Sequence, residues 1–316
     1  MGSVIKSTLT LILSVEFIIG NLGNGFIVLV NCVDWIKRRK LSLADQILTA
    51  LAISRIGLLW LMIVSWCVSV FYPALFETQE ILRTLNVTWT VTNHCSIWLA
   101  TSLSTLYFLK IAMFSNSVFL YLKWRIKKVI LVILLVALVL LVFNIALTNI
   151  LVNAWISGCR RNKTCSSGSS DYAQVTSSLL LTNTMFIFIP FTLTLTTFLL
   201  LIFSLWKHLK KMKHSVNGSR DASTKVHIKA MQTIVAFLLL YTVFFLSFFL
   251  PVWSSELLDK NMIIMFCQVI AIVYPSGHSC VLILANNKLR QTSLLVLGCR
   301  FKDSETSGHG PLTESS

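Results

Sequence analysis

The stretch that decides the fold is WTVTNHCSIWLATSLSTLYFLK, residues 89–110, together with the basic segment YLKWRIKK, residues 121–128. The first part is apolar enough for a membrane but carries polar side chains at Trp89, Asn93 and His94. Polar groups inside a lipid-spanning helix are costly, so they usually face a bundle interior or a cavity. We therefore expect one long helix from Trp89 to Lys128, with a polar pocket at one end and a cationic end in water.

The composition indicates a membrane protein. Of the 316 residues, 55% are hydrophobic and only 12% are charged, whereas a soluble domain has about 25% charged residues. The net charge is +15, but Lys and Arg cluster between apolar runs instead of covering one domain. This pattern favours contact with membrane lipid over binding of nucleic acid. The eight Cys residues show no CxxC pair and no metal-ligand spacing.

The apolar runs predict an all-α bundle of seven membrane-spanning helices. A span needs about 20 predominantly apolar residues. The chain offers seven such runs within one domain, residues 1–300, and no internal repeat. The residues after it, 301–316, are short, polar and predicted to be disordered. The predicted spans are 7–33, 46–72, 87–115, 129–152, 177–206, 230–253 and 261–285.

Charge asymmetry predicts the orientation of the bundle. Of the 27 Lys and Arg residues, 20 fall at one end of the predicted spans and six at the other. Loops rich in Lys and Arg stay in the cytoplasm, so we expect the N-terminus outside and the C-terminus inside. The sequon at Asn162 then lies outside and is the better glycosylation candidate, with Asn86 second because it is close to a membrane boundary. The sequon at Asn217 lies inside and should be silent.

Three ionisable side chains lie well within the predicted spans: Glu16, Arg55 and His278. Arg55 either pairs with Glu16 or is held by amides and hydroxyls such as those of Asn24 and Ser279. The second set is closer to Arg55 in depth, at 1.5 Å of rise per helical residue, and is preferred. Such a cluster acts either as a static polar clamp or as a switch.

The sequence contains no catalytic constellation: no HExxH, no GxSxG, no phosphate-binding loop and no paired carboxylates. We expect no enzyme, no cofactor and no metal site. A small channel or carrier is the rival function, because seven spans with an intramembrane Arg permit it. The missing repeats and the missing line of charges through the bundle argue against it.

Several motifs together resemble the type 2 bitter taste receptors, a family of seven-helix G-protein-coupled receptors, over residues 1–300. One departure is Leu106, where the family's FYxxK motif has Phe. The motifs are NGFI at 24–27, LAISR at 51–55, YFLK at 107–110, SLWKH at 204–208 followed by Met212, and PSGHSCVL at 275–282.

The resemblance implies a plasma-membrane receptor that binds diverse bitter small molecules and activates a heterotrimeric G protein of the gustducin or Gi type. Trp89 and Asn93 are four residues apart and share one helix face, where an indole beside an amide suits an apolar ligand with one orienting hydrogen bond. For Phe186 and Phe244, ordinary helix packing is an equal alternative. The ligand-binding residues so implied are Trp89, Asn93, Phe186, Phe244, Phe248 and Gln268.

The resemblance also implies residues for activation and coupling. The cytoplasmic ends of the third, fifth and sixth helices would open to admit the G protein, with topology anchoring as the alternative role for their basic residues. The implied switch residues are Asn24, Arg55, Tyr107, Tyr241, Pro275, His278 and Ser279. The implied G-protein-coupling residues are Lys110, His208 and Lys211.

Overall fold

The computed structural model describes residues 2–38, 40–72, 79–162, 170–214, 220–253, 260–296 and 298. Within these ranges the regular structure is entirely helical. The helices are α1 (Gly2–Arg38), α2 (Leu43–Phe71), α4 (Gln79–Ile111), α5 (Ser117–Trp124), α6 (Ile126–Asn162), α7 (Ser170–His214), α8 (Arg220–Trp253), α9 (Lys260–Ala285) and α10 (Asn287–Val296).

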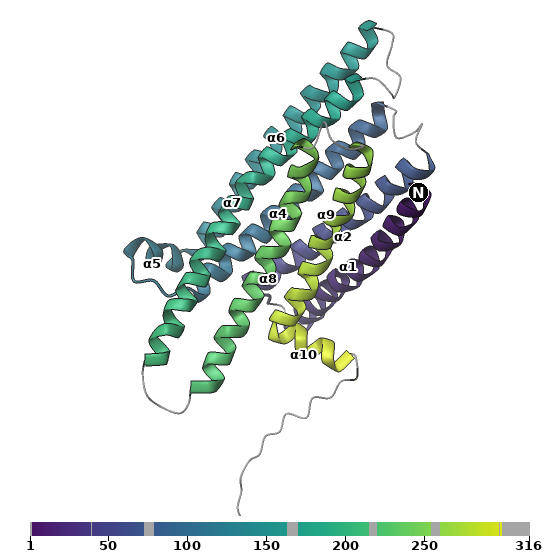
Figure 1. Ribbon diagram of the computed structural model, residues 1–316. Helices are drawn as coiled ribbons and strands as arrows, with labels where there is room; N and C mark the ends of the chain where they lie inside the picture. Colours follow the sequence, from purple (N-terminus) through teal and green to yellow (C-terminus); the bar gives the residue numbers. More distant parts are fainter. Residues whose placement is uncertain are drawn as a thin grey trace, which may run out of the picture.

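Seven of these helices are long and lie side by side as one bundle, with the N-terminus and α10 at opposite ends (Figure 1). In the described residues, six helices are long and apolar enough to cross a membrane. The seventh, α4, has 33 residues, and so is about 50 Å long at 1.5 Å per residue. It is less apolar because it packs against α2, α6 and α7 and turns many hydroxyls and amides inward. The predicted seven-helix membrane bundle is confirmed.

The prediction of a single helix from Trp89 to Lys128 is wrong. α4 ends at Ile111, and a new helix, α5, starts after Asn116, whose Oδ1 accepts a hydrogen bond from the backbone N of Val118 at 2.9 Å. An Asn side chain in this position satisfies a free N–H at the helix start. Lys123 Nζ donates to the carbonyl of Ala112 at 3.2 Å and closes the turn. The basic segment therefore lies on α5 and the first turn of α6.

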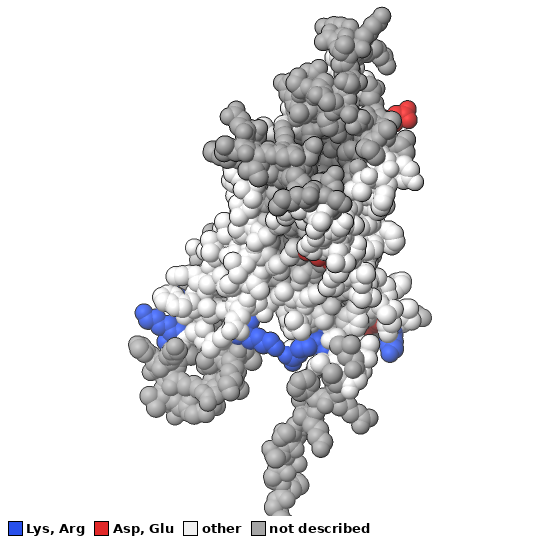
Figure 2. Space-filling view, turned by 45° about the vertical axis from the view of Figure 1, so that its right-hand side comes forward, with Lys and Arg blue, Asp and Glu red and all other residues white. Residues whose placement is uncertain are grey.

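The outer surface of the bundle suits lipid at its sides and water at one end. Large apolar side chains on α6, such as Leu131, Val139 and Phe143, are exposed. Lys and Arg gather at one end of the molecule, and the sides are free of them in Figure 2. This is the end at which α10 lies, where Lys288 pairs with Asp34 at 2.6 Å.

α4 and α7 are joined by polar side chains in a constant register. Three side-chain pairs each join residues that are 93 positions apart, so the two helices run parallel and stay aligned over several turns. The pairs, which we call the α4–α7 ladder, are Thr90 with Asn183 (3.4 Å), Thr101 with Thr194 (2.8 Å) and Ser104 with Thr197 (3.3 Å).

Candidate ligand-binding site

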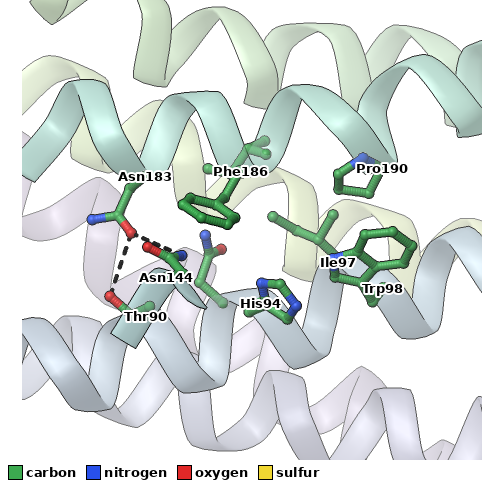
Figure 3. Close-up of a pocket in the computed structure, with 10 residues that line it drawn as sticks. Thr90, His94, Ile97, Trp98, Asn144, Asn183, Phe186 and Pro190 are labelled. Carbon is green, nitrogen blue, oxygen red and sulfur yellow. Dashed lines mark hydrogen bonds between the residues drawn. The ribbon is translucent and has the colours of Figure 1, made fainter. Parts of the chain in front are cut away.

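A small cavity lies among α4, α6 and α7 (Figure 3). Its lining follows helical spacing, because residues three and four apart share one helix face. α6 contributes Asn144. α4 contributes Thr90, Asn93, His94, Ile97 and Trp98, and α7 contributes Asn183, Phe186, Ile187 and Pro190.

One wall of the cavity is fixed by hydrogen bonds. The Oδ1 atom of Asn183 accepts from Thr90 Oγ1 at 3.4 Å and from Asn144 Nδ2 at 3.3 Å (Figure 3). His94 donates from Nε2 to the carbonyl of Ala137 at 2.8 Å, which fixes its ring. These bonds tie three helices together around the cavity, so this wall is preorganised.

Other polar groups of the cavity are unpaired. Asn93 is 3% exposed, and no hydrogen bond joins its amide to any residue that the structure describes. Asn144 Oδ1 and Trp98 Nε1 are buried and also have no partner there. A buried polar group without a partner is costly, by about 1–3 kcal/mol. These groups therefore favour a molecule that carries hydrogen-bonding atoms into an otherwise apolar space.

The sequence-predicted binding residues fall into three groups. Asn93 and Phe186 line the cavity. Trp89 lies beside it, against Phe248 (ring centres 5.5 Å apart), and Phe248 contacts Phe244 at 4.9 Å. Gln268 is exposed on α9 and is not part of the lining. Five of the six thus form one continuous region across α4, α7 and α8.

Sequence reasoning missed the polar residues opposite Asn93. Asn144 stands almost alone in the long apolar run of α6, and such a residue is a signal for an inward-facing group. Asn183 precedes Pro190 by seven residues, two helical turns on the same face. The partnership of Asn144 with Asn183 depends on how α6 and α7 cross, which no local pattern shows.

A second polar cluster, the Arg55 cluster, lies on α2 and α9. Arg55 Nη1 and His278 Nδ1 are 2.6 Å apart, and Arg55 Cζ is 5.0 Å from the ring centre of Tyr274. The expected contact of Arg55 with Asn24 and Ser279 is wrong, because these two bond to each other at 2.7 Å. Successive residues of α9 are rotated by about 100°, so His278 faces α2 while Ser279 faces α1.

The alternative partner of Arg55 is not observed either. The Oε2 atom of Glu16 is buried without a partner in the described part of the chain. Glu16 lies at the level of Ser276, whose hydroxyl donates to the Glu16 carbonyl at 3.0 Å. The remaining switch residues are buried or half-buried: Asn24 donates to the Pro275 carbonyl at 3.4 Å, Tyr241 is 1% exposed, and Tyr107 is partly buried in the core.

The predicted coupling and glycosylation residues are only partly described. Lys110 is exposed at the end of α4, and His208 is half-buried on α7. Asn86 is half-buried near the start of α4. Two predictions concern side chains outside the described set, those of Lys211 and Asn162. Asn217 and the tail 301–316 also lie outside the described residues.

A bundle of seven membrane helices around a polar cavity is the architecture of a seven-helix membrane receptor. Residues 1–300 match the family model for Taste receptor protein (TAS2R). The chain belongs to this family of G-protein-coupled receptors and is a bitter taste receptor of the plasma membrane, not an enzyme. The channel or carrier alternative is not favoured.

Individual relatives agree with the family model. The chain is 64% identical to taste receptor type 2 member 14 of Papio hamadryas and 63% identical to that of Homo sapiens, in both cases over 100% of each protein. It is 52% identical to taste receptor type 2 member 140 of Rattus norvegicus, over 94% of this chain and 95% of the relative. The first two are both type 2 member 14 receptors.

Proposed function

We propose that this receptor binds chemically varied bitter compounds in the cavity among α4, α6 and α7 and, in response, activates a G protein of the gustducin or Gi type. The observation that carries the proposal is that Asn93, 3% exposed, lines the cavity with an amide that makes no hydrogen bond to a described residue. A ligand that forms one hydrogen bond with this amide supplies the partner that the amide lacks in the unliganded receptor. Phe186 and Ile187 supply the apolar surface around it.

The size of the cavity sets how a ligand enters. Its volume of about 10 Å³ has room for about one water molecule, so a ligand must enlarge the cavity in order to bind. The neighbouring rings of Trp89 and Phe248 pack against each other at a tilt of 50°, with their centres 5.5 Å apart. Their separation would enlarge the space toward α8. Few fixed polar groups among many aromatic rings favour broad recognition at modest affinity.

Tyr274 gives the cavity region a route to the Arg55 cluster. Its ring centre lies 4.8 Å from that of Phe244 and 5.2 Å from that of His278. A ligand that prefers the active bundle shifts the population toward that state. Displacement of the Phe244 ring by a ligand would therefore press on Tyr274 and bias the packing of α2 against α9.

The orientation and the coupling surface follow from charge. Lys and Arg gather at the α10 end (Figure 2), and the positive-inside rule puts that end in the cytoplasm. Lys110, His208 and Lys211 would then meet the G protein, with the basic residues also touching anionic lipid. Asn162, and secondarily Asn86, would carry glycan on the opposite side.

The test is a calcium-mobilisation assay in cells that express the receptor with a gustducin-type α-subunit. We expect Asn93→Ala to raise the half-maximal concentration of some agonists about 5–100-fold, the loss of one buried hydrogen bond, and to spare others. Thr92→Ala is the matched control, because the Thr92 hydroxyl bonds only to the backbone of its own helix. Unchanged potency of Asn93→Ala for a diverse panel, at equal surface level, places the binding site elsewhere.

A further inference from the structure

The charge of Arg55 has no counter-charge among the described residues. Its side chain is 0% exposed, and a guanidinium stays protonated in proteins. Within the described ranges, the ion pair present joins Lys288 to Asp34, and no carboxylate lies within ion-pairing distance of Arg55. An unpaired charge in a membrane interior is costly, so the bundle needs a negative group at this point.

The guanidinium has one occupied and one free side. Nη1 meets His278 Nδ1 at 2.6 Å, and because an Arg nitrogen only donates, this imidazole nitrogen accepts and the His278 ring is neutral. Nε and Nη2 are both buried without a hydrogen-bond partner in the described part of the chain. These two nitrogens form one edge of the planar guanidinium, with parallel N–H bonds that grip an anion in a fork.

The surroundings of this edge do not neutralise it. Tyr274 lies over the guanidinium, with its ring centre 5.0 Å from Cζ, and its hydroxyl also interacts with Arg55; a ring face and a neutral phenol contribute only partial negative charge. Asn24 and Ser279 are hydrogen-bonded to each other and to the Pro275 carbonyl. The cluster thus keeps a net charge of +1.

We propose that the Nε–Nη2 edge of Arg55 binds a small monovalent anion of the halide class, chloride under physiological conditions. A monatomic anion is favoured over a larger polyatomic one because Arg55 is 0% exposed. A water molecule would satisfy the same two N–H groups but would leave the charge uncompensated. The bound anion neutralises the Arg55 cluster and stabilises the packing of α2 against α9, at a site distinct from the ligand cavity.

The experiment is a halide titration of the full-length receptor in lipid nanodiscs, at constant sodium and ionic strength, with gluconate as the replacement anion. Thermal unfolding is followed with a thiol-reactive dye, which reports exposure of the buried, free Cys267. We expect chloride and bromide to raise Tm saturably, by about 2–4 °C, and gluconate to have no effect. A Tm of the wild-type receptor that does not respond to halide overturns the proposal.

Two variants locate the effect. Arg55→Lys keeps the charge but loses the two-pronged edge, so its chloride midpoint should rise at least about tenfold, or 1.4 kcal/mol. Arg83→Gln is the matched control, because Arg83 is an exposed Arg that donates to Asn149 at 3.1 Å; it should titrate like the wild type. A wild-type midpoint in Arg55→Lys overturns the assignment. A map of the wild-type receptor in bromide is decisive without any variant: anomalous density at the Arg55 edge supports the site, and its absence refutes it.

Discussion

The indole of Trp89 on α4 and the ring of Phe248 on α8 lie 5.5 Å apart, tilted by 50°. This contact joins a helix that lines the cavity to one that does not, and Phe248 continues through Phe244 to Tyr274. Aromatic pairs of this kind contribute about 0.5–1.5 kcal/mol beyond their buried area. The side of the cavity toward α8 is therefore held by ring packing, while the opposite side is held by hydrogen bonds.

Replacement of Trp89 by Ala should weaken most agonists, because it removes a large apolar surface and not one specific hydrogen bond. We expect half-maximal concentrations to rise about 5–30-fold, which corresponds to roughly 1–2 kcal/mol. The measurement is a dose–response panel of chemically diverse agonists at matched surface level. Wild-type potency across the panel would show that ligands do not reach this side.

Replacement of Arg55 by Ala should reduce both surface expression and signalling. The change leaves His278 buried without its partner and removes the contact with Tyr274. Loss of the hydrogen-bond partner of a buried polar group costs about 1–3 kcal/mol. Surface labelling and agonist response measure the effect, with Arg83→Ala as the control. Normal values of both for Arg55→Ala would exclude a role of the cluster in packing and in switching.

Neutralisation of Lys110 or His208 should lower the maximal response more than the potency. Lys110 is exposed at the end of α4, and His208 is half-buried at the corresponding end of α7. A residue that contacts the G protein affects how much signal each occupied receptor gives. G-protein activation by Lys110→Gln and by His208→Ala is compared with that of Lys40→Gln, an exposed Lys ahead of α2. An unchanged maximum would leave these residues as topology anchors.

Glycosylation tests the orientation directly. Replacement of Asn162 by Gln should abolish most of the mobility shift that a glycosidase causes, because positive-inside loops place this sequon outside. Replacement of Asn217 by Gln should have no effect. A glycan that depends on Asn217 would reverse the orientation of the whole bundle.

The α4–α7 ladder can be measured as a coupling energy. Thr101→Val and Thr194→Val should each lower the thermal stability of the receptor, and the double variant should lose less than the sum. A coupling of about 0.6–1.7 kcal/mol is expected for a hydrogen bond between membrane helices. Additive losses would mean that the 2.8 Å contact contributes no net stability.

The apolar runs predicted the bundle because helix number and length in a membrane follow from hydrophobicity alone. The apolar runs did not predict the end of α4 at Ile111 and the start of a short new helix after Asn116. The sequence signal for this helix start is an Asn followed by Ser117, which is weak compared with the long apolar and basic pattern around it. The partner of Arg55 was also missed. The prediction compared depth along each helix and therefore chose Asn24 and Ser279. The observed partner, His278, is set by the rotation of each helix about its axis, which sequence spacing does not fix between helices.

For the cavity, sequence reasoning found the α4 face because Trp89 and Asn93 lie one turn apart within a single helix. It did not find Asn144 or Asn183, because these residues line the cavity only as a result of where α6 and α7 pack along α4. Phe186 was found through the family resemblance and lines the cavity. Gln268 was chosen on the same grounds and is exposed on α9.

The constant offset of 93 residues between α4 and α7 has a mechanical consequence. A slip of one helix along the other by a single residue, 1.5 Å, would misalign all three polar pairs simultaneously. The two helices therefore resist sliding along each other, because all three hydrogen bonds would have to break together. A ligand bound between these two helices and α8 contacts the rigid α4–α7 pair on one side and packed aromatic rings on the other. The displacement that it causes is therefore a displacement of α8.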